Sequence, residues 1–458
     1  MKSHDLTIIG SGPGGYVAAI KAAQLGLDTA IIEKEAIGGV CLNWGCIPTK
    51  ALLQSSKLYK DILDAKTFGV NVDTKSVSPD LDKMVKRKDK IVKKLTGGVG
   101  FLFKKNGVTV YNGEASVKDA HNIAVGDETI QTKHLIIATG AHPAVPPIEG
   151  LEDGLEKGFV HTSKTMLDVK EIPKKLTIIG GGIIGMEFAT IYSTLGTEVT
   201  ILEKMDDILI GVDTEIKEAY KKTLKKIKNL TIVSGADVSK VEKSSIAYAL
   251  SGEKKSVEHD AVLLSTGMKP NLNGLEALDL EKEKGFIKTD ASLRTNVKDV
   301  YAIGDVNGKH MLAHVASKEG IVAVETILGH DKKVDYTKVP SGIYTFPEIA
   351  QVGMTEAEAK EKGIDYKVST FPISANGKAL AEGQSTGMVK MLAETKYNEI
   401  IGVHILSDHA TELISESVLG MTLEARAEDF AEAIHPHPTL SEMMHETAHG
   451  IVDKPIHI

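Results

Sequence analysis

The chain has 458 residues, of which 42% are hydrophobic and 25% are charged. This length suggests about three domains, and the composition is ordinary for a globular protein. The formal net charge of −8 provides no basic excess that would attract nucleic acid. No apolar run is long enough to cross a bilayer, and the first residues enter a strand without space for a signal peptide. We therefore expect a cytoplasmic protein, unless a presequence has been removed.

The first predicted element is an apolar strand over residues 6–9, which runs into a glycine-rich turn. Gly10, Gly12 and Gly15 follow the spacing G-x-G-x-x-G, and a helix and a second strand come after them. The first glycine permits the tight turn, the second lets the backbone approach a pyrophosphate, and the third lets helix and strand pack closely. Glu33 ends the second strand, 18 residues after Gly15, where its carboxylate can accept hydrogen bonds from ribose hydroxyls.

The two cysteines, Cys41 and Cys46, lie five positions apart directly after this unit. The loop between them is so short that a disulfide there would restrict little unfolded-chain entropy. In a reducing cytosol such a disulfide is usually catalytic or redox-sensing. Cys46 precedes Pro48, which is favoured in the first turn of a helix, and a helix N-terminus stabilises a thiolate. We therefore expect a thiol–disulfide couple, and two buried, inert cysteines are the alternative.

The strand–glycine–helix–strand pattern returns 170 residues later. Gly180, Gly182 and Gly185 repeat the fingerprint, and Glu203 again follows the third glycine by 18 residues. One such motif is weak evidence, but two copies with matching strands and acids indicate two dinucleotide sites. The carboxylate of Glu203 would repel a 2′-phosphate, and no arginine stands beside it. The second site therefore favours NAD over NADP.

Three further predicted strands end in short turns. The first two end in Thr139-Gly140 and Thr266-Gly267, and each is expected to close one nucleotide-binding unit. The third ends at Asp305. An ordinary strand-end turn is the alternative interpretation of this aspartate.

Taken in this order, these pieces closely resemble the flavoprotein disulfide reductases over essentially the whole chain. The residues around the cysteines are most similar to the dihydrolipoyl dehydrogenase branch, and so is the segment His-Pro-His-Pro-Thr-Leu-Ser-Glu that ends at Glu442. The resemblance implies FAD at the first fingerprint and NAD at the second. It also implies a Cys41–Cys46 disulfide that oxidises protein-bound dihydrolipoamide and passes the electrons through FAD to NAD⁺. Cys46 would face the flavin, and Cys41 would be attacked by the substrate.

The same resemblance implies an α/β fold with two nested Rossmann-like dinucleotide-binding domains and an α+β C-terminal dimerisation domain. Residues 1–147 would form the first part of the FAD-binding domain and residues 148–272 the NAD-binding domain. Residues 273–338 would complete the FAD-binding and central segment, and residues 339–458 would form the interface domain of a homodimer. The implied partners are the lipoyl domains of 2-oxo acid dehydrogenase complexes or of a glycine cleavage system, with no role for nucleic acid or membrane.

Further site residues are assigned by position in the resemblance. Those on the FAD side, besides the fingerprint and Glu33, are Lys50 near the flavin ring, Gly113, Thr139, Gly140, Asp305 and Ala313. Those on the NAD side, besides the second fingerprint and Glu203, are Glu187, Val238 and Gly267. Glu187 is also expected to pair with Lys50.

A general base is expected near the C-terminus, because a dithiol must lose a proton before it attacks a disulfide. Histidine is the natural base near neutral pH. His437 is followed five residues later by Glu442, which would orient it. His435 is the alternative base, since the neighbouring prolines keep the stretch extended and alternate side chains then point to opposite sides. The resemblance favours His437 and implies that it acts in the active site of the partner subunit.

One motif competes with this interpretation. His445, Glu446 and His449 form H-E-x-x-H, the zinc-protease signature. The third histidine of the extended form would fall at Pro455, and the chain ends soon afterwards. We therefore expect no metal site.

Two other functions remain open from the sequence. A glutathione- or mercury-type reductase is the first, but Glu203 argues against NADPH, and no extra cysteines stand near the C-terminus. A non-catalytic subunit of a larger complex is the second. This alternative is disfavoured, because the chain keeps all the expected catalytic residues, namely Cys41, Cys46, Lys50, His437 and Glu442.

Overall fold

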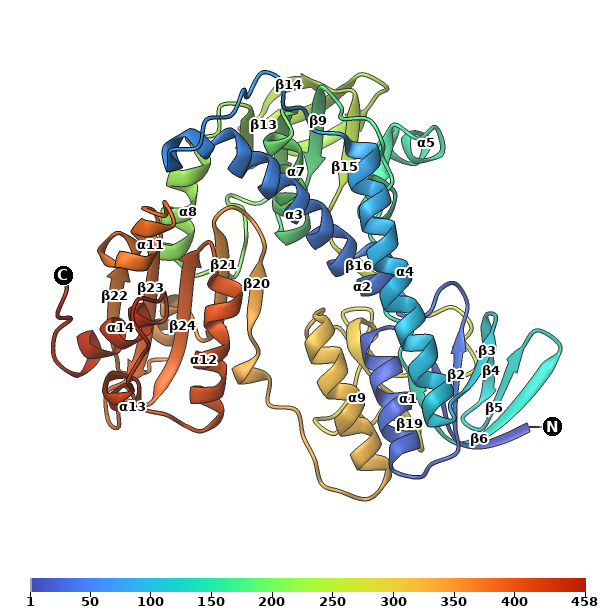
Figure 1. The fold of residues 1–458 in the computed structure, drawn as a ribbon. Helices are drawn as coiled ribbons and strands as arrows, with labels where there is room; N and C mark the ends of the chain where they lie inside the picture. Colours follow the sequence, from blue (N-terminus) through green and yellow to red (C-terminus); the bar gives the residue numbers. More distant parts are fainter. Residues whose placement is uncertain (1) are drawn as a thin grey trace. The chain divides into compact units, whose positions relative to one another are not determined.

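The computed structural model describes residues 2–458, which divide into two compact units. The first unit comprises the residues up to Ser55, Asp73–Ile172 and Leu263–Val334. The second comprises Ser56–Val72, Pro173–Val262 and Asp335–Ile458. Figure 1 labels the elements along the chain. Both units are discontinuous in sequence, and the four-segment division expected from the sequence stays a prediction.

The first unit is built on one mixed sheet. Its strands are β1 (Lys2–Ile9), β2 (Thr29–Glu33), β3 (Thr109–Asn112), β4 (Ala115–Asp119), β5 (Asn122–Val125), β6 (Glu128–Ile137) and β19 (Val300–Ala302). The strand order is β3-β2-β1-β6-β5-β4, with β19 also paired to β6. β1 is parallel to β2 and β6, so the first fingerprint leaves the carboxyl end of a central parallel strand. This is the edge at which open α/β sheets bind ligands.

The rest of this unit consists of helices and short strands. They are α1 (Pro13–Gln24), α2 (Gly39–Trp44), α4 (Leu81–Asn106), α5 (Leu151–Glu156), α6 (Ser163–Met166), α9 (Ala313–Ile327), the 3₁₀ turn η2 (Gly304–Asn307), β7 (Ala141–Pro143), β8 (Val160–Thr162), β16 (Met268–Pro270), β17 (Lys282–Glu283) and β18 (Phe286–Ile287). α3 (Cys46–Leu63) and β15 (Ala261–Leu264) cross the boundary between the units.

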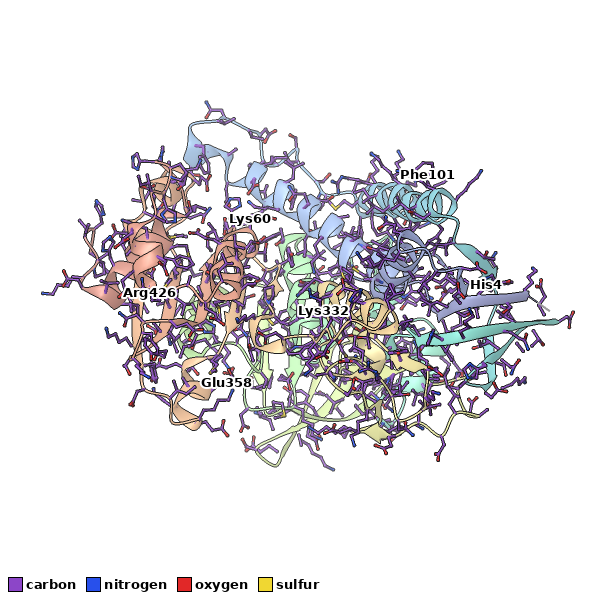
Figure 2. The ribbon with its side chains drawn as sticks, turned by 90° about the horizontal axis from the view of Figure 1, so that it is seen from below. His4, Lys60, Phe101, Lys332, Glu358 and Arg426 are labelled. Atoms are coloured by element: carbon purple, nitrogen blue, oxygen red, sulfur yellow. The ribbon has the colours of Figure 1, made fainter. Side chains whose placement is uncertain are left out.

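α1 and α9 lie side by side (Figure 1) because two glycines let their backbones approach. A Cβ at Gly320 of α9 would stand 2.6 Å from the Gly14 carbonyl oxygen of α1. In the sheet, Nε2 of the buried His4 of β1 lies within hydrogen-bond distance, 3.0 Å, of the Tyr111 hydroxyl of β3. Figure 2 shows His4 and also Phe101 of α4, whose side chain is exposed.

The second unit contains a parallel sheet, a meander and an antiparallel sheet. Its strands are β9 (Lys175–Ile179), β10 (Glu198–Glu203), β11 (Leu230–Ser234), β12 (Asp237–Val241), β13 (Ser245–Leu250), β14 (Glu253–Glu258), β20 (Ser341–Ile343), β21 (Glu348–Gly353), β22 (Tyr366–Pro372), β23 (Met388–Glu394) and β24 (Ile400–Ser407). β9, β10 and β11 are parallel neighbours. β12, β13 and β14 form the meander, and the antiparallel sheet has the order β20-β21-β24-β23-β22.

The helices of the second unit are α7 (Ile183–Thr194), α8 (Thr214–Leu224), α10 (Glu356–Glu361), α11 (Gly377–Ala381), α12 (Ala410–Thr422), α13 (Ala427–Glu432) and α14 (Glu442–Val452), with the 3₁₀ turns η1 (Ala65–Phe68), η3 (Tyr336–Lys338) and η4 (Ile373–Ala375). α12 and α14 pack on the antiparallel sheet, and their apolar residues join its core. The expected α/β class, with two Rossmann-like nucleotide-binding domains and an α+β C-terminal dimerisation domain, is confirmed.

Candidate active site

Packing requires glycine at two positions of the first glycine loop but not at the third. Gly10 has φ +99°, and a Cβ on it would stand 2.3 Å from the Ala138 carbonyl oxygen. A Cβ on Gly15 would stand 1.9 Å from the Gly10 carbonyl oxygen. A Cβ on Gly12 would meet no atom within 4 Å. Because Gly12 caps α1, the space beside it lies at a helix N-terminus, where unpaired N–H groups attract phosphate.

Glu33 closes this loop from the end of β2. One carboxylate oxygen accepts hydrogen bonds from Ser11 N–H at 2.9 Å and from the Ser11 hydroxyl at 2.6 Å. The other oxygen accepts one from Glu35 N–H at 2.8 Å. Gly113, which follows β3, donates its N–H to the Glu33 carbonyl at 2.9 Å and has φ +143°. The structure thus brings Gly113 beside Glu33, and a contact of Gly113 with FAD stays a prediction.

Asp305 and Ala313 also lie near the first loop. A Cβ on Gly14 would stand 3.1 Å from Ile303, the residue that precedes η2, and 3.0 Å from the Ala316 carbonyl in the first turn of α9. Asp305 is in η2 and Ala313 begins α9. Burial, helped by the charge of Glu319, raises the pKa of Asp305 to about 6.

Buried Glu319 is a residue that the sequence analysis missed. Its carboxylate accepts hydrogen bonds from Gly304 N–H at 2.6 Å and from the Asn307 amide at 3.0 Å. It therefore fixes the turn that carries Asp305. A lone glutamate within an apolar helix is the only sequence signal that could have identified it.

The cysteine segment is anchored on the first loop. Gly38 N–H donates to the Ser11 carbonyl at 3.1 Å, and a Cβ on Gly39 would stand 2.6 Å from Gly12 Cα. The Asn43 amide donates to the Ile37 and Gly39 carbonyls at 3.0 and 2.9 Å. Packing of backbone on backbone at Gly39 therefore sets where the first cysteine lies relative to the fingerprint.

Cys41 lies in α2, and Cys46 is the first residue of α3. The helix start expected near Cys46 is therefore present, and its N-terminal N–H groups favour a thiolate. Both cysteines are partly buried. The hydrogen bond with Cys46, burial and the charge of Cys46 together raise the pKa of the Cys41 thiol. In the reduced pair, Cys41 therefore keeps its proton while Cys46 is placed to carry the negative charge.

Trp44 lies between the two cysteines. The ammonium of Lys164 stands 4.0 Å from the centre of its indole ring, which is a cation–π contact. Lys164 also forms an ion pair with Glu35. These contacts connect the redox segment to α6 and to the residues just after β2.

The second glycine loop repeats the arrangement of the first. Gly180 has φ +109°, and a Cβ on Gly182 would meet nothing within 4 Å. Gly182 caps α7, and Gly185 is buried in the first turn of that helix. Glu203 accepts hydrogen bonds from Gly181 N–H at 2.6 Å and from Met205 N–H at 2.7 Å.

Two other residues assigned to the NAD side lie in the same unit. Ala236 N–H donates to the Glu203 carbonyl at 2.8 Å, which places Val238 of β12 two residues from this contact. Glu187 is buried on α7 and accepts a hydrogen bond from Tyr344 N–H at 3.2 Å.

The two Thr-Gly turns meet each other, which the sequence did not indicate. β7, directly after Gly140, pairs with β16, directly after Gly267. The Thr139 hydroxyl donates to the Asn271 carbonyl at 2.7 Å, and the Thr266 hydroxyl donates to the Ala144 carbonyl at 3.0 Å. Gly140 and Gly267 both have positive φ with no atom near a would-be Cβ. The two turns are therefore joined in one ribbon.

The two candidate base histidines near the C-terminus differ sharply in exposure to solvent. His437 is 80% exposed, and its Nδ1 lies 2.8 Å from Glu442 Oε1. His435 is 9% exposed, with Nδ1 3.1 Å from the Ala433 carbonyl and Nε2 2.8 Å from Glu416. Burial opposes the charge of Glu442, but hydrogen bonds from Thr439 N–H and His437 lower its pKa overall. Only His437 presents a nitrogen, Nε2, to an incoming thiol.

The H-E-x-x-H residues have other contacts. Glu446 accepts hydrogen bonds from Ile456 and His457 N–H and lies 2.8 Å from His457 Nδ1. The rings of His445 and His449 contact each other edge to face, with their centres 4.5 Å apart. Within residues 2–458, no group of three or more His, Cys, Asp or Glu could hold a metal ion.

Some expected neighbours belong to different units. Cys41, Cys46 and Lys50 are in the first unit, and Glu187, His437 and Glu442 are in the second. The pairing of Lys50 with Glu187, and the meeting of His437 with the cysteines, stay predictions.

Comparison with known proteins agrees with this geometry. Residues 4–320 match the pyridine nucleotide-disulphide oxidoreductase family model, and residues 339–448 match the dimerisation domain of the same family. The chain belongs to the pyridine nucleotide-disulphide oxidoreductases.

Relatives in this family are similar over most of the chain. A dihydrolipoyl dehydrogenase of Acholeplasma laidlawii is 51% identical over 72% of this chain and 98% of its own length. One of Bacillus subtilis is 41% identical over 99% of this chain and 97% of its own, and a mitochondrial one of Arabidopsis thaliana is 42% identical over 99% and 92%.

Solved structures of the family share the fold. The HOCl-induced flavoprotein disulfide reductase of Escherichia coli has a TM-score of 0.87 at 26% identity, covering 98% of this chain and all of that one. LpdA from Mycobacterium tuberculosis has a TM-score of 0.89 at 23% identity, covering 98% and 99%. In the described residues of this oxidoreductase, no helix has both the length and the apolar character to cross a membrane.

The oxidoreductase uses FAD and NAD, and its two glycine loops fit these cofactors. Each loop leaves open space beside a middle glycine at a helix N-terminus and carries a carboxylate on the next strand. A pyrophosphate and a ribose require these two features.

We predict that Gly12→Ala leaves the apoprotein folded but lowers the FAD content of the purified oxidoreductase. The added methyl group meets no protein atom but occupies the space for the pyrophosphate. Flavin absorbance per chain and the circular dichroism of apoprotein would measure the two effects.

Gly10→Ala is the matched control, because its Cβ clashes with backbone at positive φ. Strain of this kind costs about 1–3 kcal/mol, so the apoprotein itself should be destabilised. Full FAD content in Gly12→Ala would contradict the assignment of this loop.

Proposed function

We propose that this chain is an NAD-dependent dihydrolipoyl dehydrogenase, which oxidises protein-bound dihydrolipoamide to lipoamide. The observation that carries the proposal is the cysteine pair, with Cys46 at the start of a helix and Cys41 hydrogen-bonded to it. The names of relatives 41–51% identical support this substrate. Glu203, which would repel a 2′-phosphate, supports NAD over NADP.

The reaction begins with the loss of a proton from the substrate dithiol. His437 accepts this proton at Nε2 while Glu442, bound at Nδ1, stabilises the charged imidazolium. The substrate thiolate then attacks Cys41 of the Cys41–Cys46 disulfide, and a mixed disulfide forms as Cys46 leaves as a thiolate.

The second substrate thiol then displaces Cys41 and its proton passes to the departing Cys41 sulfur, which gives the cyclic disulfide of lipoamide and the reduced cysteine pair with Cys41 as a thiol and Cys46 as a thiolate. The electron pair lost by the substrate now resides on Cys41 and Cys46, and the helix N-terminus stabilises the Cys46 thiolate. Bound FAD supplies the two-electron carrier between this pair and NAD⁺.

The partners follow from the same assignment. The dimerisation domain supports a homodimer, in which each active site would combine the cysteines of one subunit with His437 of the other. The lipoyl domains of a 2-oxo acid dehydrogenase complex or of a glycine cleavage system would deliver the dithiol.

A glutathione- or mercury-type reductase is the competing function. A steady-state assay that compares dihydrolipoamide with reduced glutathione, each with NAD and with NADP, separates the two functions.

Thiol titration tests the redox pair directly, because the chain has only two cysteines. Denatured oxidised protein should show no free thiol, and protein reduced with dihydrolipoamide should show two. Cys41→Ser and Cys46→Ser should each show one thiol in both states. Two free thiols in protein fully oxidised by NAD⁺ would exclude the disulfide.

His437→Gln should slow dihydrolipoamide oxidation by roughly a hundredfold, the usual scale for a lost general base, with FAD still bound. Glu442→Gln keeps the shape of the orienting group without its charge and should have a smaller effect. His435→Gln tests the alternative base, and a larger loss there than in His437→Gln would reverse the assignment.

Mixing His437→Gln with Cys41→Ser subunits tests whether the site is shared. In a heterodimer with composite sites, one site carries both lesions and the other is intact, so activity should partly return. Verified heterodimers without recovery would show that His437 acts within its own chain or is not the base.

Glu203→Ala should reduce the preference for NAD over NADP, measured as the ratio of kcat/KM values. The variant removes the carboxylate that repels a 2′-phosphate. Lys204→Ala is the matched control, because Lys204 is the next residue and 79% exposed. An unchanged ratio in Glu203→Ala would refute this role.

A further inference from the structure

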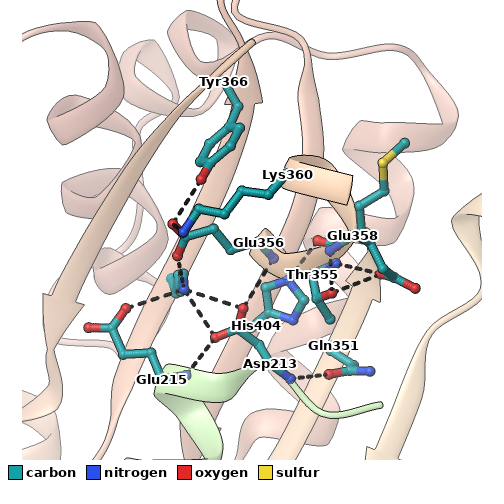
Figure 3. Close-up of polar contacts among 11 residues, drawn as sticks. Asp213, Glu215, Gln351, Thr355, Glu356, Glu358, Lys360, Tyr366 and His404 are labelled. Carbon is teal, nitrogen blue, oxygen red and sulfur yellow. Dashed lines mark hydrogen bonds and ion pairs between the residues drawn. The ribbon is translucent and has the colours of Figure 1, made fainter. Parts of the chain in front are cut away.

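A buried ion cluster in the second unit lies at the end of the segment that follows Glu203. Lys390 of β23 and Asp213 are 2% and 1% exposed, and Lys390 Nζ lies 3.1 and 3.3 Å from the two Asp213 carboxylate oxygens. The same ammonium lies 2.7 Å from Glu356 and 3.3 Å from Glu215. Figure 3 labels Asp213, Glu215 and Glu356. One buried cation thus holds three carboxylates from two parts of the sequence.

Asp213 is also the N-cap of α8. Its Oδ1 accepts a hydrogen bond from Glu215 N–H at 3.1 Å, and its Oδ2 accepts one from Glu356 N–H at 3.3 Å. Burial opposes its charge, but buried His404 and Lys390 lower its pKa overall. Hydrogen bonds from Lys360 and Lys390 lower the pKa of Glu356 to about 2, despite its partial burial. Both carboxylates are therefore charged at neutral pH.

Gln351 of β21 holds the same end of the segment without any charge. Its amide donates to the Gly211 carbonyl at 2.8 Å, and its carbonyl oxygen lies 3.4 Å from Asp213 N (Figure 3). Residues 204–213 are thus bound at their far end by Lys390 and Gln351, both on the antiparallel sheet.

The near end of this segment is bound to the second glycine loop. Met205 N–H donates to the Glu203 carboxylate at 2.7 Å, and Leu209 N–H donates to the Gly181 carbonyl at 3.0 Å. Leu209 is buried with φ +49°, a conformation that a leucine adopts only when its surroundings hold it. A Cβ on Gly181 would stand 2.7 Å from Ile208.

We infer that Lys390 and Gln351 are positioning residues for the coenzyme site, which hold residues 204–213 against Glu203 and the second glycine loop. The inference rests on the proposed binding of NAD at that loop. The two residues act through residues 204–213, which connect their contacts to the second glycine loop. Loss of either contact would free the left-handed Leu209 to relax and would release Met205 from the ribose-binding carboxylate.

Gln351→Ala is the cleaner test, because it removes two hydrogen bonds and leaves no buried charge. It should raise the KM for NAD⁺ and the Kd for NADH by about fivefold, the scale of one net hydrogen bond. Lys390→Met should raise both by about tenfold. The KM for dihydrolipoamide, and the rate at which it reduces the holoenzyme without NAD⁺, should not change in either variant.

Lys88→Met is the matched control for a lost buried lysine. Lys88 is 3% exposed and pairs with Asp168 and Asp89 in the first unit. Lys88→Met, like Lys390→Met, should lower thermal stability, but it should not change the Kd for NADH. An equal rise in Kd in Lys88→Met would show that the effect is general destabilisation and would overturn the inference.

Glu203→Ala in the same titration separates this inference from the proposed coenzyme site. If Glu203→Ala binds NADH as tightly as wild type, the coenzyme assignment itself fails. If Glu203→Ala weakens NADH binding but Gln351→Ala does not, only the positioning role fails. Should Lys390→Met not fold, Gln351→Ala alone decides the outcome.

Discussion

Each nucleotide-binding loop is held in shape by a carboxylate from the end of the next strand. Glu33 accepts hydrogen bonds from Ser11, and Glu203 accepts one from Gly181, so each loop keeps its form before any ligand arrives. The middle glycine of each loop then leaves an open space that no protein atom fills. The cysteine segment depends on this constraint, because Gly38 and Gly39 pack directly on the first loop.

The buried cluster around Lys390 has a different energetic character. Removal of one partner from a buried ion pair costs about 3–5 kcal/mol, because the remaining charge is left without compensation. Replacing the entire cluster with apolar residues is often neutral, so the cluster is weak evidence for stability as such. The cluster connects α8 and α10 to β23, because Lys390 Nζ contacts Asp213 and Glu215 at the start of α8 and Glu356 at the start of α10.

Local patterns predicted much of the fold and the site. The spacing of Gly10, Gly12 and Gly15 was sufficient to place the strand, the turn and the helix, because each glycine has a separate local role in the turn. The helix start at Cys46 and the contact between His437 and Glu442 were also predicted, since both depend on residues close in sequence.

Contacts between distant residues were beyond the reach of such patterns. Lys390 and Asp213 are 177 positions apart, and a lysine in a strand reads as an exposed residue until the fold buries it. Glu319 likewise reads as a polar position on a helix, although it is buried against the turn that carries Asp305. The pairing of β7 with β16 has no sequence signal, because each strand is only three residues long.

Trp44 gives the protein an optical property of its own. It is the one tryptophan in the sequence, and it stands between the two cysteines with the Lys164 ammonium above its ring. Indole emission dominates the ultraviolet fluorescence of a protein and responds to nearby charge and quenching groups. The indole emission of the unlabelled chain therefore arises at the redox segment alone. Time-resolved decay of that signal can follow the motion of this segment in turnover without a dye or an introduced residue.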